Sequence, residues 1–157
     1  MQKVPITPQG YQRLQVELER LLKVERPQNI KAIAEAKAHG DLSENAEYHA
    51  AKERQSFIVG RIQELQTKIA LANVIDPSKI SQDKAAFGAK VKVLDSGTGE
   101  EKSFMLVGPD EADVKNGKIS ISSPVGKSLI GKLAGDTVTI QAPAKTIEYE
   151  ILEIRFE

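Results

Sequence analysis

The apolar positions between residues 48 and 72 recur in alternating steps of three and four over more than three heptads. They are Tyr48, Ala51, Gln55, Ile58, Ile62, Leu65, Ile69 and Ala72. This spacing predicts a long helix that pairs with another helix as a coiled coil, with Gln55 as the polar member of the seam. Gly60 weakens the helix by about 1 kcal/mol relative to alanine. We expect Asp76-Pro77 to end it.

A second helical pattern lies nearer the N-terminus. Thr7 followed by Pro8 predicts a helix start, because threonine is a good N-cap and proline at the first helical position has no N–H to satisfy. An apolar stripe then follows at spacings of four and three, formed by Leu14, Leu18 and Leu21. The sequence therefore predicts an amphipathic helix that begins at about residue 8.

Pro27 interrupts this stripe and predicts a kink or local break, because an internal proline removes a backbone hydrogen bond and clashes with the preceding turn. Ile30 and Ile33 begin a stripe in a different phase, and an alanine-rich stretch continues to Gly40. Glycine accepts left-handed backbone, so we expect Gly40 to end the helix. Two arms of roughly 30 residues, each about 45 Å long, thus predict an antiparallel hairpin with an acidic tip at residues 40–47.

The C-terminal half has a different pattern. Eight of the eleven glycines lie beyond residue 78, and β-branched residues alternate with polar ones. Strands are predicted at residues 90–94, 103–107, about 119–121, 138–141 and 147–154. Pro124 and Gly131 bracket a short helix. The chain is therefore predicted to be an α+β protein of two domains, an antiparallel α-helical coiled-coil hairpin at 1–77 and a small, mostly antiparallel sheet domain with one short helix at 78–157.

Composition narrows the classes of function. The 22 basic and 22 acidic side chains balance, so bulk charge does not attract the protein to nucleic acid or anionic lipid. The absence of cysteine excludes thiol catalysis, cysteine-ligated zinc and disulfides. The N-terminus lacks the apolar region of a signal peptide, and no apolar run approaches the length of a membrane span. We expect a cytoplasmic protein with no membrane partner.

Two explanations fit Asp41 and Glu44, which stand three positions apart in the turn. An aspartate N-cap with a glutamate at N3 forms a capping box, and the helix dipole favours carboxylates there. Capping does not require the tip to lie far from the rest of the chain, however. The functional interpretation is that one or both carboxylates bind a hard divalent cation such as Mg²⁺. Two carboxylates do not complete such a site, so a partner or a substrate phosphate would supply the other ligands.

Basic residues and histidines near the tip also have two explanations. Lys37, Lys52 and Arg54 fit a solvated helix face, or a small patch that guides a phosphate backbone towards the carboxylates. His39 and His49 flank the turn, and a zinc site of two histidines and two carboxylates is conceivable, although their spacing does not make them converge.

The residues around the turn resemble a known family. Residues 40–53 read Gly-Asp-Leu-Ser-Glu-Asn-Ala-Glu-Tyr-His-Ala-Ala-Lys-Glu, which is similar to the coiled-coil tip of the bacterial transcript cleavage factors, the Gre family. Further similarity lies at residues 6–11 (start of the family), at Arg26-Pro27 with Ile30, Ile33 and 34–36 (first helix), and at 123–132 and 135–138 (C-terminal domain). The resemblance covers essentially the full chain in order. The modest basic content beyond Lys52 favours the GreA branch over the more basic GreB branch.

The resemblance implies a fold and a mechanism. The C-terminal domain would be FKBP-like and would dock at the rim of the secondary channel of RNA polymerase. The coiled coil would reach the polymerase active centre, where Asp41 and Glu44 would help to hold a second Mg²⁺ and an attacking water for cleavage of the backtracked RNA 3′ end. The polymerase would remain the nuclease, so the chain is expected not to be an enzyme itself. It is expected to act as a monomer, and Mg²⁺ is not expected in the free protein.

Two alternatives stay open from the sequence. A Gre homologue could occupy the channel and inhibit polymerase without stimulating cleavage, although the presence of both Asp41 and Glu44 argues against this. A hairpin adaptor or holdase could use the coiled coil only to bind partners. Neutralising the tip would leave that activity intact but would abolish cleavage.

Overall fold

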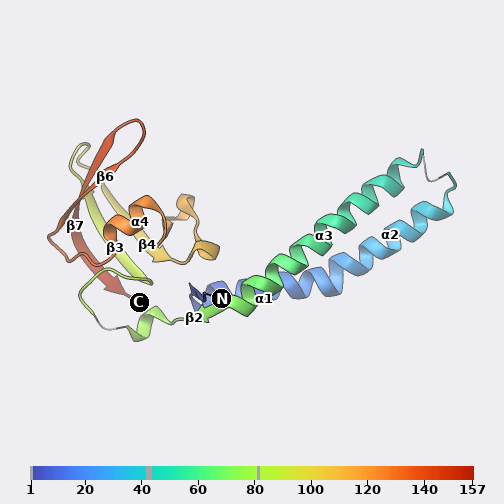
Figure 1. Ribbon diagram of the computed structural model, residues 1–157, viewed down its shortest axis with the longest axis horizontal. Helices are drawn as coiled ribbons and strands as arrows, with labels where there is room; N and C mark the ends of the chain where they lie inside the picture. Colours follow the sequence, from blue (N-terminus) through green and yellow to red (C-terminus); the bar gives the residue numbers. More distant parts are fainter. Residues whose placement is uncertain (1, 42–43, 81) are drawn as a thin grey trace. The chain divides into compact units, whose positions relative to one another are not determined.

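The computed structural model describes residues 2–41, 44–80 and 82–157. The chain forms two compact units, a helical hairpin of residues 11–71 and a globular unit that combines residues 1–10 with residues 72–157. The predicted α+β class with an N-terminal helical hairpin is confirmed (Figure 1). The division differs from the predicted boundary after residue 77, because the first ten residues and residues 72–77 belong to the globular unit.

The first arm of the hairpin is helical throughout but changes its hydrogen-bond pattern once. Its elements are α1 (Pro8–Arg20), the π-helical turn η1 (Leu21–Glu25) and α2 (Arg26–Ala38). The Arg26 N–H donates to the Leu21 carbonyl, five residues back. Pro27 has no N–H to donate, and its ring crowds the carbonyl four residues earlier. The wider turn accommodates both effects, so the irregularity predicted at Pro27 is a π-turn in an otherwise continuous helix.

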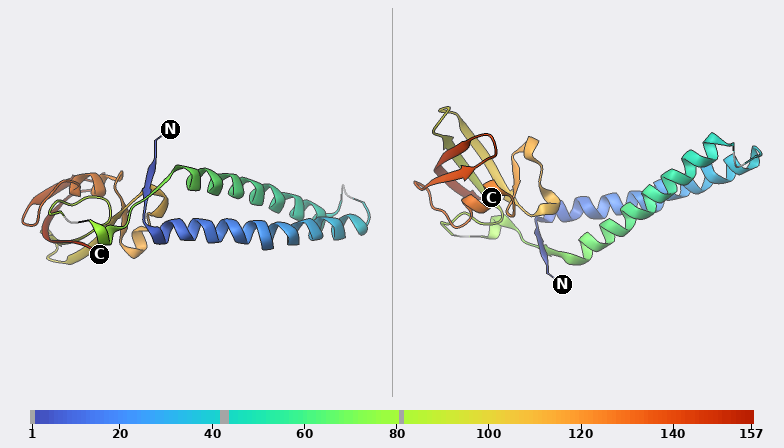
Figure 2. Two further views of the ribbon diagram at one scale, coloured as in Figure 1. Left: turned by 90° about the horizontal axis from the view of Figure 1, so that it is seen from below. Right: turned by 45° about the horizontal axis from the view of Figure 1, so that its top comes forward.

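The second arm is the single helix α3 (Ala46–Leu71), which runs antiparallel beside α2 in each view (Figures 1 and 2). The predicted seam is confirmed, since it contains every buried residue of α3: Ala51, Ile58, Ile62 and Leu65. The helix ends at Leu71, however, and not at the predicted Asp76-Pro77. The residues after Leu71 form the strand β2 (Ala72–Val74), so Ala72 is not part of the helix.

The buried face of α2 differs from the prediction. Ile30 is 57% exposed, whereas Asn29 and Ala36 are 4% and 2% exposed. The π-turn adds a residue to the helical cycle, and the face towards α3 then follows Asn29, Ile33 and Ala36 at spacings of four and three. The Asn29 amide is satisfied in the seam because its Nδ2 donates to the Ala51 carbonyl at 2.9 Å. The stripe predicted through Ile30 is therefore wrong by one position.

Ion pairs join the two arms beside the apolar seam. Arg61 of α3 donates twice to Glu17 of α1, with Nε–Oε2 and Nη2–Oε1 distances of 2.5 and 2.7 Å. Arg61 also pairs with Glu64 at 3.1 Å. The hydrogen bonds from Arg61 hold the pKa of Glu17 below its usual value of 4.5. These contacts fix the alignment of the two antiparallel helices with bonds of defined geometry.

The segments on either side of the hairpin meet in the globular unit. Strand β1 (Val4–Ile6) pairs with β2 in parallel, with Val4 opposite Ala72. Thr7 is 2% exposed and caps α1, because its Oγ1 accepts from the Gly10 N–H at 3.1 Å. Glu111 in turn accepts from the Thr7 N–H at 2.9 Å and from the Thr7 hydroxyl at 2.5 Å. The predicted cap at Thr7 is confirmed, and a carboxylate distant in sequence supports it.

The core of the globular unit lies on one face of a five-stranded sheet. Its strands follow the order β5–β4–β3–β7–β6, and only the β4–β5 pair is parallel. The strands are β3 (Ala89–Asp95), β4 (Glu101–Val107), β5 (Lys118–Ser120), β6 (Thr137–Gln141) and β7 (Thr146–Phe156). Helix α4 (Pro124–Leu129) contributes the fully buried Leu129 to this core. The predicted sheet and short helix are confirmed.

Short helical turns complete the globular unit. They are η2 (Pro77–Lys79), η3 (Pro109–Glu111) and η4 (Val114–Asn116). Throughout the described residues, no helix combines the length and the apolar character that crossing a bilayer requires.

Replacing Glu17 by glutamine should weaken the hairpin in a pH-dependent way. Because the folded-state pKa of Glu17 is lowered, its contribution to stability is present above the unfolded-state pKa and is lost as the pH falls through the folded-state pKa. Glu17 is 41% exposed, so we expect Glu17→Gln to cost about 0.5–1 kcal/mol at pH 7. The cost should disappear well below pH 4.5.

Urea unfolding followed by helical circular dichroism at pH 7 and at low pH measures this effect. Glu19→Gln is the matched control, because Glu19 pairs with Lys23 one turn along the same exposed helix face. It should cost no more than about 0.5 kcal/mol. An equal loss for Glu17→Gln at both pH values would contradict the role given to the Arg61 pair.

Replacing Gly108 by alanine should displace β1. A Cβ at Gly108 would lie 1.9 Å from the Pro5 carbonyl oxygen, and this backbone atom has no side-chain freedom with which to move aside. We expect a loss of about 1–3 kcal/mol in the free energy of unfolding of the globular unit. The Ile75 N–H, which donates to the Ile6 carbonyl at 2.8 Å, should exchange faster with deuterium.

Gly60→Ala is the control for Gly108→Ala. A Cβ at Gly60 has no atom within 4 Å, so alanine should stabilise α3 by up to about 1 kcal/mol. It should leave the exchange of the Ile75 N–H unchanged. If Gly108→Ala also leaves that exchange unchanged, then the close approach of β1 to Gly108 is not required for the fold.

Candidate functional site

The turn of the hairpin begins where α2 ends. The His39 N–H donates to the Ala36 carbonyl at 3.2 Å, and the Gly40 N–H donates to the Lys37 carbonyl at 3.4 Å. Gly40 then adopts a φ of +118°, which side chains rarely tolerate. The predicted stop at Gly40 is confirmed. Leu42 and Ser43, which belong to the predicted acidic tip, lie outside the described residues.

Asn45 joins the end of α2 to the start of α3. Its Oδ1 accepts from the Tyr48 N–H at 3.0 Å, which is the bond of an N-cap to the third residue of a helix. Its Nδ2 donates to the Ala36 carbonyl at 2.7 Å. One side chain therefore satisfies a backbone group on each arm of the hairpin.

This arrangement excludes the capping box, which was one of the two explanations for Asp41 and Glu44. Helix α3 begins at Ala46, so its N-cap is Asn45. Asp41 lies too early in the chain to cap this helix, and Glu44 directly precedes the cap instead of following it by three positions. Asparagine is as good an N-cap as aspartate. Asn45, three residues before Tyr48, is therefore an N-cap candidate that the sequence itself shows. The Asn45 cap is the feature that our sequence analysis missed.

Asp41 and Glu44 are both exposed and line one shallow depression of about 400 Å³. His39, Asn45, Ala46 and Glu47 complete its lining. The imidazole Nδ1 of His39 lies 3.5 Å from Oε2 of Glu47, and both side chains are mostly exposed. The two predicted carboxylates thus share one accessible surface of the turn.

The chemistry of this surface fits a partial site for a hard cation. Carboxylate oxygens are the ligands that Mg²⁺ prefers, and Mg²⁺ is usually held by one or two protein carboxylates together with waters and substrate phosphates. Among the described residues, no group of three or more His, Asp or Glu side chains is placed to hold a metal ion. The zinc site of His39, His49, Asp41 and Glu44 is therefore not formed in the described part of the turn. His49 instead contacts the Tyr48 ring edge-on, with centroids 5.8 Å apart.

The three basic residues near the tip have different surroundings. Lys37 and Lys52 are exposed. The Arg54 guanidinium pairs across the hairpin with Glu25, whose other oxygen lies 3.2 Å from Arg20. The hydrogen bond from Arg54 lowers the pKa of Glu25. Arg54 thus belongs to the ion pairs that join the arms, which leaves Lys37 and Lys52 as the better candidates for a phosphate-guiding role.

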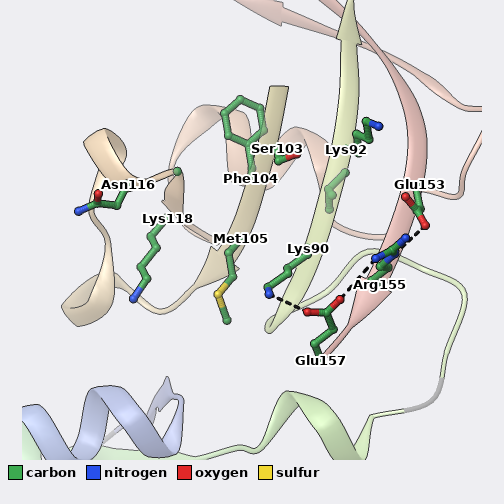
Figure 3. A pocket seen from close by; sticks show the side chains of 12 residues that line it. Lys90, Lys92, Ser103, Phe104, Met105, Asn116, Lys118, Glu153, Arg155 and Glu157 are labelled. Atoms are coloured by element: carbon green, nitrogen blue, oxygen red, sulfur yellow. Dashed lines mark hydrogen bonds and ion pairs between the residues drawn. The ribbon is translucent and has the colours of Figure 1, made fainter. Parts of the chain in front are cut away.

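The globular unit carries a larger depression of about 600 Å³ over strands β3, β4, β5 and β7 (Figure 3). Its charged side chains mostly neutralise one another. Lys90 pairs with Glu157 at 2.8 Å, and Arg155 lies between Glu153 at 2.6 Å and Glu157 at 3.6 Å. The lining contains no histidine, cysteine or aspartate that could act with Ser103 in nucleophilic catalysis. The hairpin turn is therefore the stronger candidate for a site with chemistry of its own.

Two family models match the chain. The model described as transcription elongation factor, N-terminal, covers residues 4–74, and the model described as transcription elongation factor, GreA/GreB, C-term, covers residues 80–156. The boundary between the matches lies close to the division predicted from the sequence.

Similar proteins span the same length. The chain is 72% identical over 155 residues to the transcription elongation factor GreA of Thermodesulfovibrio yellowstonii, covering 99% of this chain and 98% of the relative. It is 54% identical over 157 residues to the GreA of Alkalilimnicola ehrlichii, covering 99% of each. A solved structure of GreA factor homolog 1 (Gfh1) of Thermus thermophilus is 30% identical, with 98% and 99% coverage and a TM-score of 0.45. The chain therefore belongs to the GreA/GreB family of transcription elongation factors.

Proposed function

We propose that this chain is a transcript cleavage factor that acts on RNA polymerase. The hairpin enters the secondary channel of a polymerase that has backtracked. The exposed carboxylates of Asp41 and Glu44 then complete a Mg²⁺ site at the displaced RNA 3′ end. The polymerase cleaves the RNA and resumes elongation, and the factor supplies ligands without being the nuclease. Family membership and the geometry of the turn both support this proposal.

The observation that carries the proposal is that the residue that caps α3 is not one of the two exposed acids. Asn45 caps α3, and the carboxylates of Asp41 and Glu44 remain on the surface of one depression. Two exposed carboxylates that share one accessible surface, beside an α3 cap supplied by Asn45, fit a role towards a ligand outside the chain.

The chemistry follows from what each group can supply. A pair of Mg²⁺ ions in such a centre activates the attacking water and stabilises the leaving oxygen of the phosphodiester. Asp41 and Glu44 provide negative oxygen ligands from one side, and the catalytic carboxylates of the polymerase provide them from the other. The factor alone presents too few ligands to complete the site, and it stimulates cleavage that is intrinsic to the polymerase. The proposed activity therefore exists only in the complex.

Replacing Asp41 by asparagine and Glu44 by glutamine should abolish the stimulation of cleavage. Loss of residues that only support metal ligands costs about 10–100-fold, so we expect loss of the ligands themselves to lower the cleavage rate by about 100-fold or more. The measurement uses purified polymerase on backtracked elongation complexes with end-labelled RNA and Mg²⁺. RNA shortening and polymerase binding are followed for each variant.

Glu47→Gln is the control, because Glu47 lines the same depression and the change removes a negative charge by the same substitution as Glu44→Gln. It should bind and stimulate cleavage like the wild type. If the wild type binds polymerase and the RNA stays intact, then the chain inhibits transcription by occupying the channel. If the wild type does not bind polymerase at all, an adaptor role is favoured and the proposal is wrong.

The double variant Lys37→Gln/Lys52→Gln should raise the concentration of factor that gives half-maximal cleavage. The size of this effect should depend on the salt concentration. Each lost contact to a single-stranded phosphate should reduce the slope of log affinity against log salt by about 0.7. The concentration of factor that gives half-maximal cleavage, measured over a series of salt concentrations, checks this.

Arg54→Gln should behave differently from the lysine variants. It should lower the thermal midpoint of the hairpin, because it removes the partner of Glu25 on the other arm and leaves only Arg20 of the same arm. At temperatures where the hairpin is folded, the salt slope should stay as in the wild type. A reduced slope for Arg54→Gln and an unchanged slope for the lysine variant would reverse the roles that we assign to these cations.

A further inference from the structure

Asn45 makes hydrogen bonds to both arms of the hairpin at the point where the turn begins and ends. The Ala36 carbonyl belongs to the last turn of α2, and the Tyr48 N–H belongs to the first turn of α3. We propose that Asn45 is a positioning residue, which sets the placement of Asp41 and Glu44 by closing the loop that carries them. This inference rests on the proposed function and concerns the same tip.

Other contacts described between the two arms are weaker or lie further from the tip. The ion pair of His39 with Glu47 also spans the turn, but both side chains are mostly exposed and water screens the attraction. The Asn29 bond to the Ala51 carbonyl lies about two helical turns further from the tip than Ala36. The Glu25–Arg54 pair lies further still. The bonds of Asn45 are short and shielded in part from solvent, so they form a strong polar link between the arms beside the carboxylates.

The chemistry of the side chain explains why asparagine stands at this position. An N-cap must present an acceptor to the helix N–H groups, and serine, threonine, aspartate and asparagine all do so. The bond to the Ala36 carbonyl needs a donor in addition. Of these four, only asparagine has an amide N–H₂ that reaches across while its oxygen caps the helix. A serine would keep the cap but would be too short to reach the second arm.

Closing the loop matters for Mg²⁺ because this ion demands near-octahedral geometry at short ligand distances. Glu44 directly precedes Asn45 in the chain, and Asp41 follows the end of α2 by three residues. The bond of Asn45 to the Ala36 carbonyl therefore ties the segment that carries Glu44 to the helix that leads to Asp41. If that link opens, the two ligands no longer approach the ion in a fixed arrangement, and more Mg²⁺ is needed to populate the productive complex.

The experiment compares the wild type with Asn45→Ala, which loses both bonds, and with Asn45→Ser, which keeps the cap alone. Cleavage of backtracked RNA is measured at saturating factor over a range of Mg²⁺ concentrations. We expect the Mg²⁺ concentration for half-maximal cleavage to rise by about tenfold in both variants, in line with the effect of residues that orient metal ligands. Polymerase binding should stay unchanged, because neither variant alters the charge of the tip.

A second readout does not depend on cleavage. The chain has no cysteine, so the exposed Ala38 and Ala50 can be replaced by cysteine and spin-labelled in each background. The distribution of distances between the two labels should be narrow in the wild type. It should broaden in Asn45→Ala and Asn45→Ser.

Asn29→Ala is the matched control, since Asn29 also joins the arms by an amide bond to a backbone carbonyl. It should lower the thermal midpoint of the hairpin but leave the label distances and the Mg²⁺ requirement at wild-type values. If Asn29→Ala raises the Mg²⁺ requirement as much as Asn45→Ser, then Asn45 acts only through hairpin stability and the inference fails. A wild-type Mg²⁺ requirement in both Asn45 variants also overturns it.

Failure of the proposed function would look different from failure of this inference. It would show as a wild-type chain that stimulates no cleavage at any Mg²⁺ concentration, and the positioning role would fall with it. A wild type that cleaves, with Asn45 variants that cleave equally well, would leave the proposed function intact and refute the role of Asn45 alone.

Discussion

Two antiparallel helices joined by one turn leave unpaired carbonyl groups at the end of the first helix and unpaired N–H groups at the start of the second. In this hairpin a single amide, that of Asn45, bonds to the Tyr48 N–H and to the Ala36 carbonyl, which also accepts from the His39 N–H. Gly40 ends α2 with a positive φ. Because Asn45 caps α3, neither Asp41 nor Glu44 is the N-cap of this helix. Both carboxylates are exposed on the surface of the turn.

The two arms are joined by an apolar seam with polar contacts placed along it. Leu21, Ile58, Ile62 and Leu65 supply burial, which favours association but tolerates sliding by a heptad. Asn29 inside the seam donates to the Ala51 carbonyl, and the Glu17–Arg61 pair lies beside the seam. An Asn29 amide buried without a partner would be costly. The seam therefore holds the helices together, and the polar contacts satisfy the groups that lie in and beside it.

Local patterns in the sequence predict much of this fold, and the failures have identifiable causes. The heptad spacing from Ala51 to Ile69 and the alternation in β3 are local signals and predict α3 and the strand correctly. The stripe predicted after Pro27 was wrong at Ile30 because the π-turn, which periodicity does not reveal, places Asn29, Ile33 and Ala36 on the face towards α3. The end of α3 was wrong because β2 forms only through pairing with the distant β1. At the tip, the acidic pair was placed correctly on the turn, but the capping box considered for Asp41 and Glu44 is not formed, because Asn45 caps α3. Whether Asp41 and Glu44 bind Mg²⁺ stays a prediction, because their other ligands would belong to another molecule.

The parallel pairing of β1 with β2 has a consequence for how the chain can vary. The residues that precede the hairpin and those that follow it are neighbours in one small sheet, so residues 11–71 form an insertion between two adjacent strands of the globular unit. Adding or deleting seven residues in each arm would preserve the seam and leave both strands in register. Such a protein family can change the length of its hairpin, and so the depth that its tip reaches, without redesigning the globular unit. By the same topology, a fragment that begins at residue 78 lacks both β1 and β2, and would leave the backbone beside Gly108 uncovered.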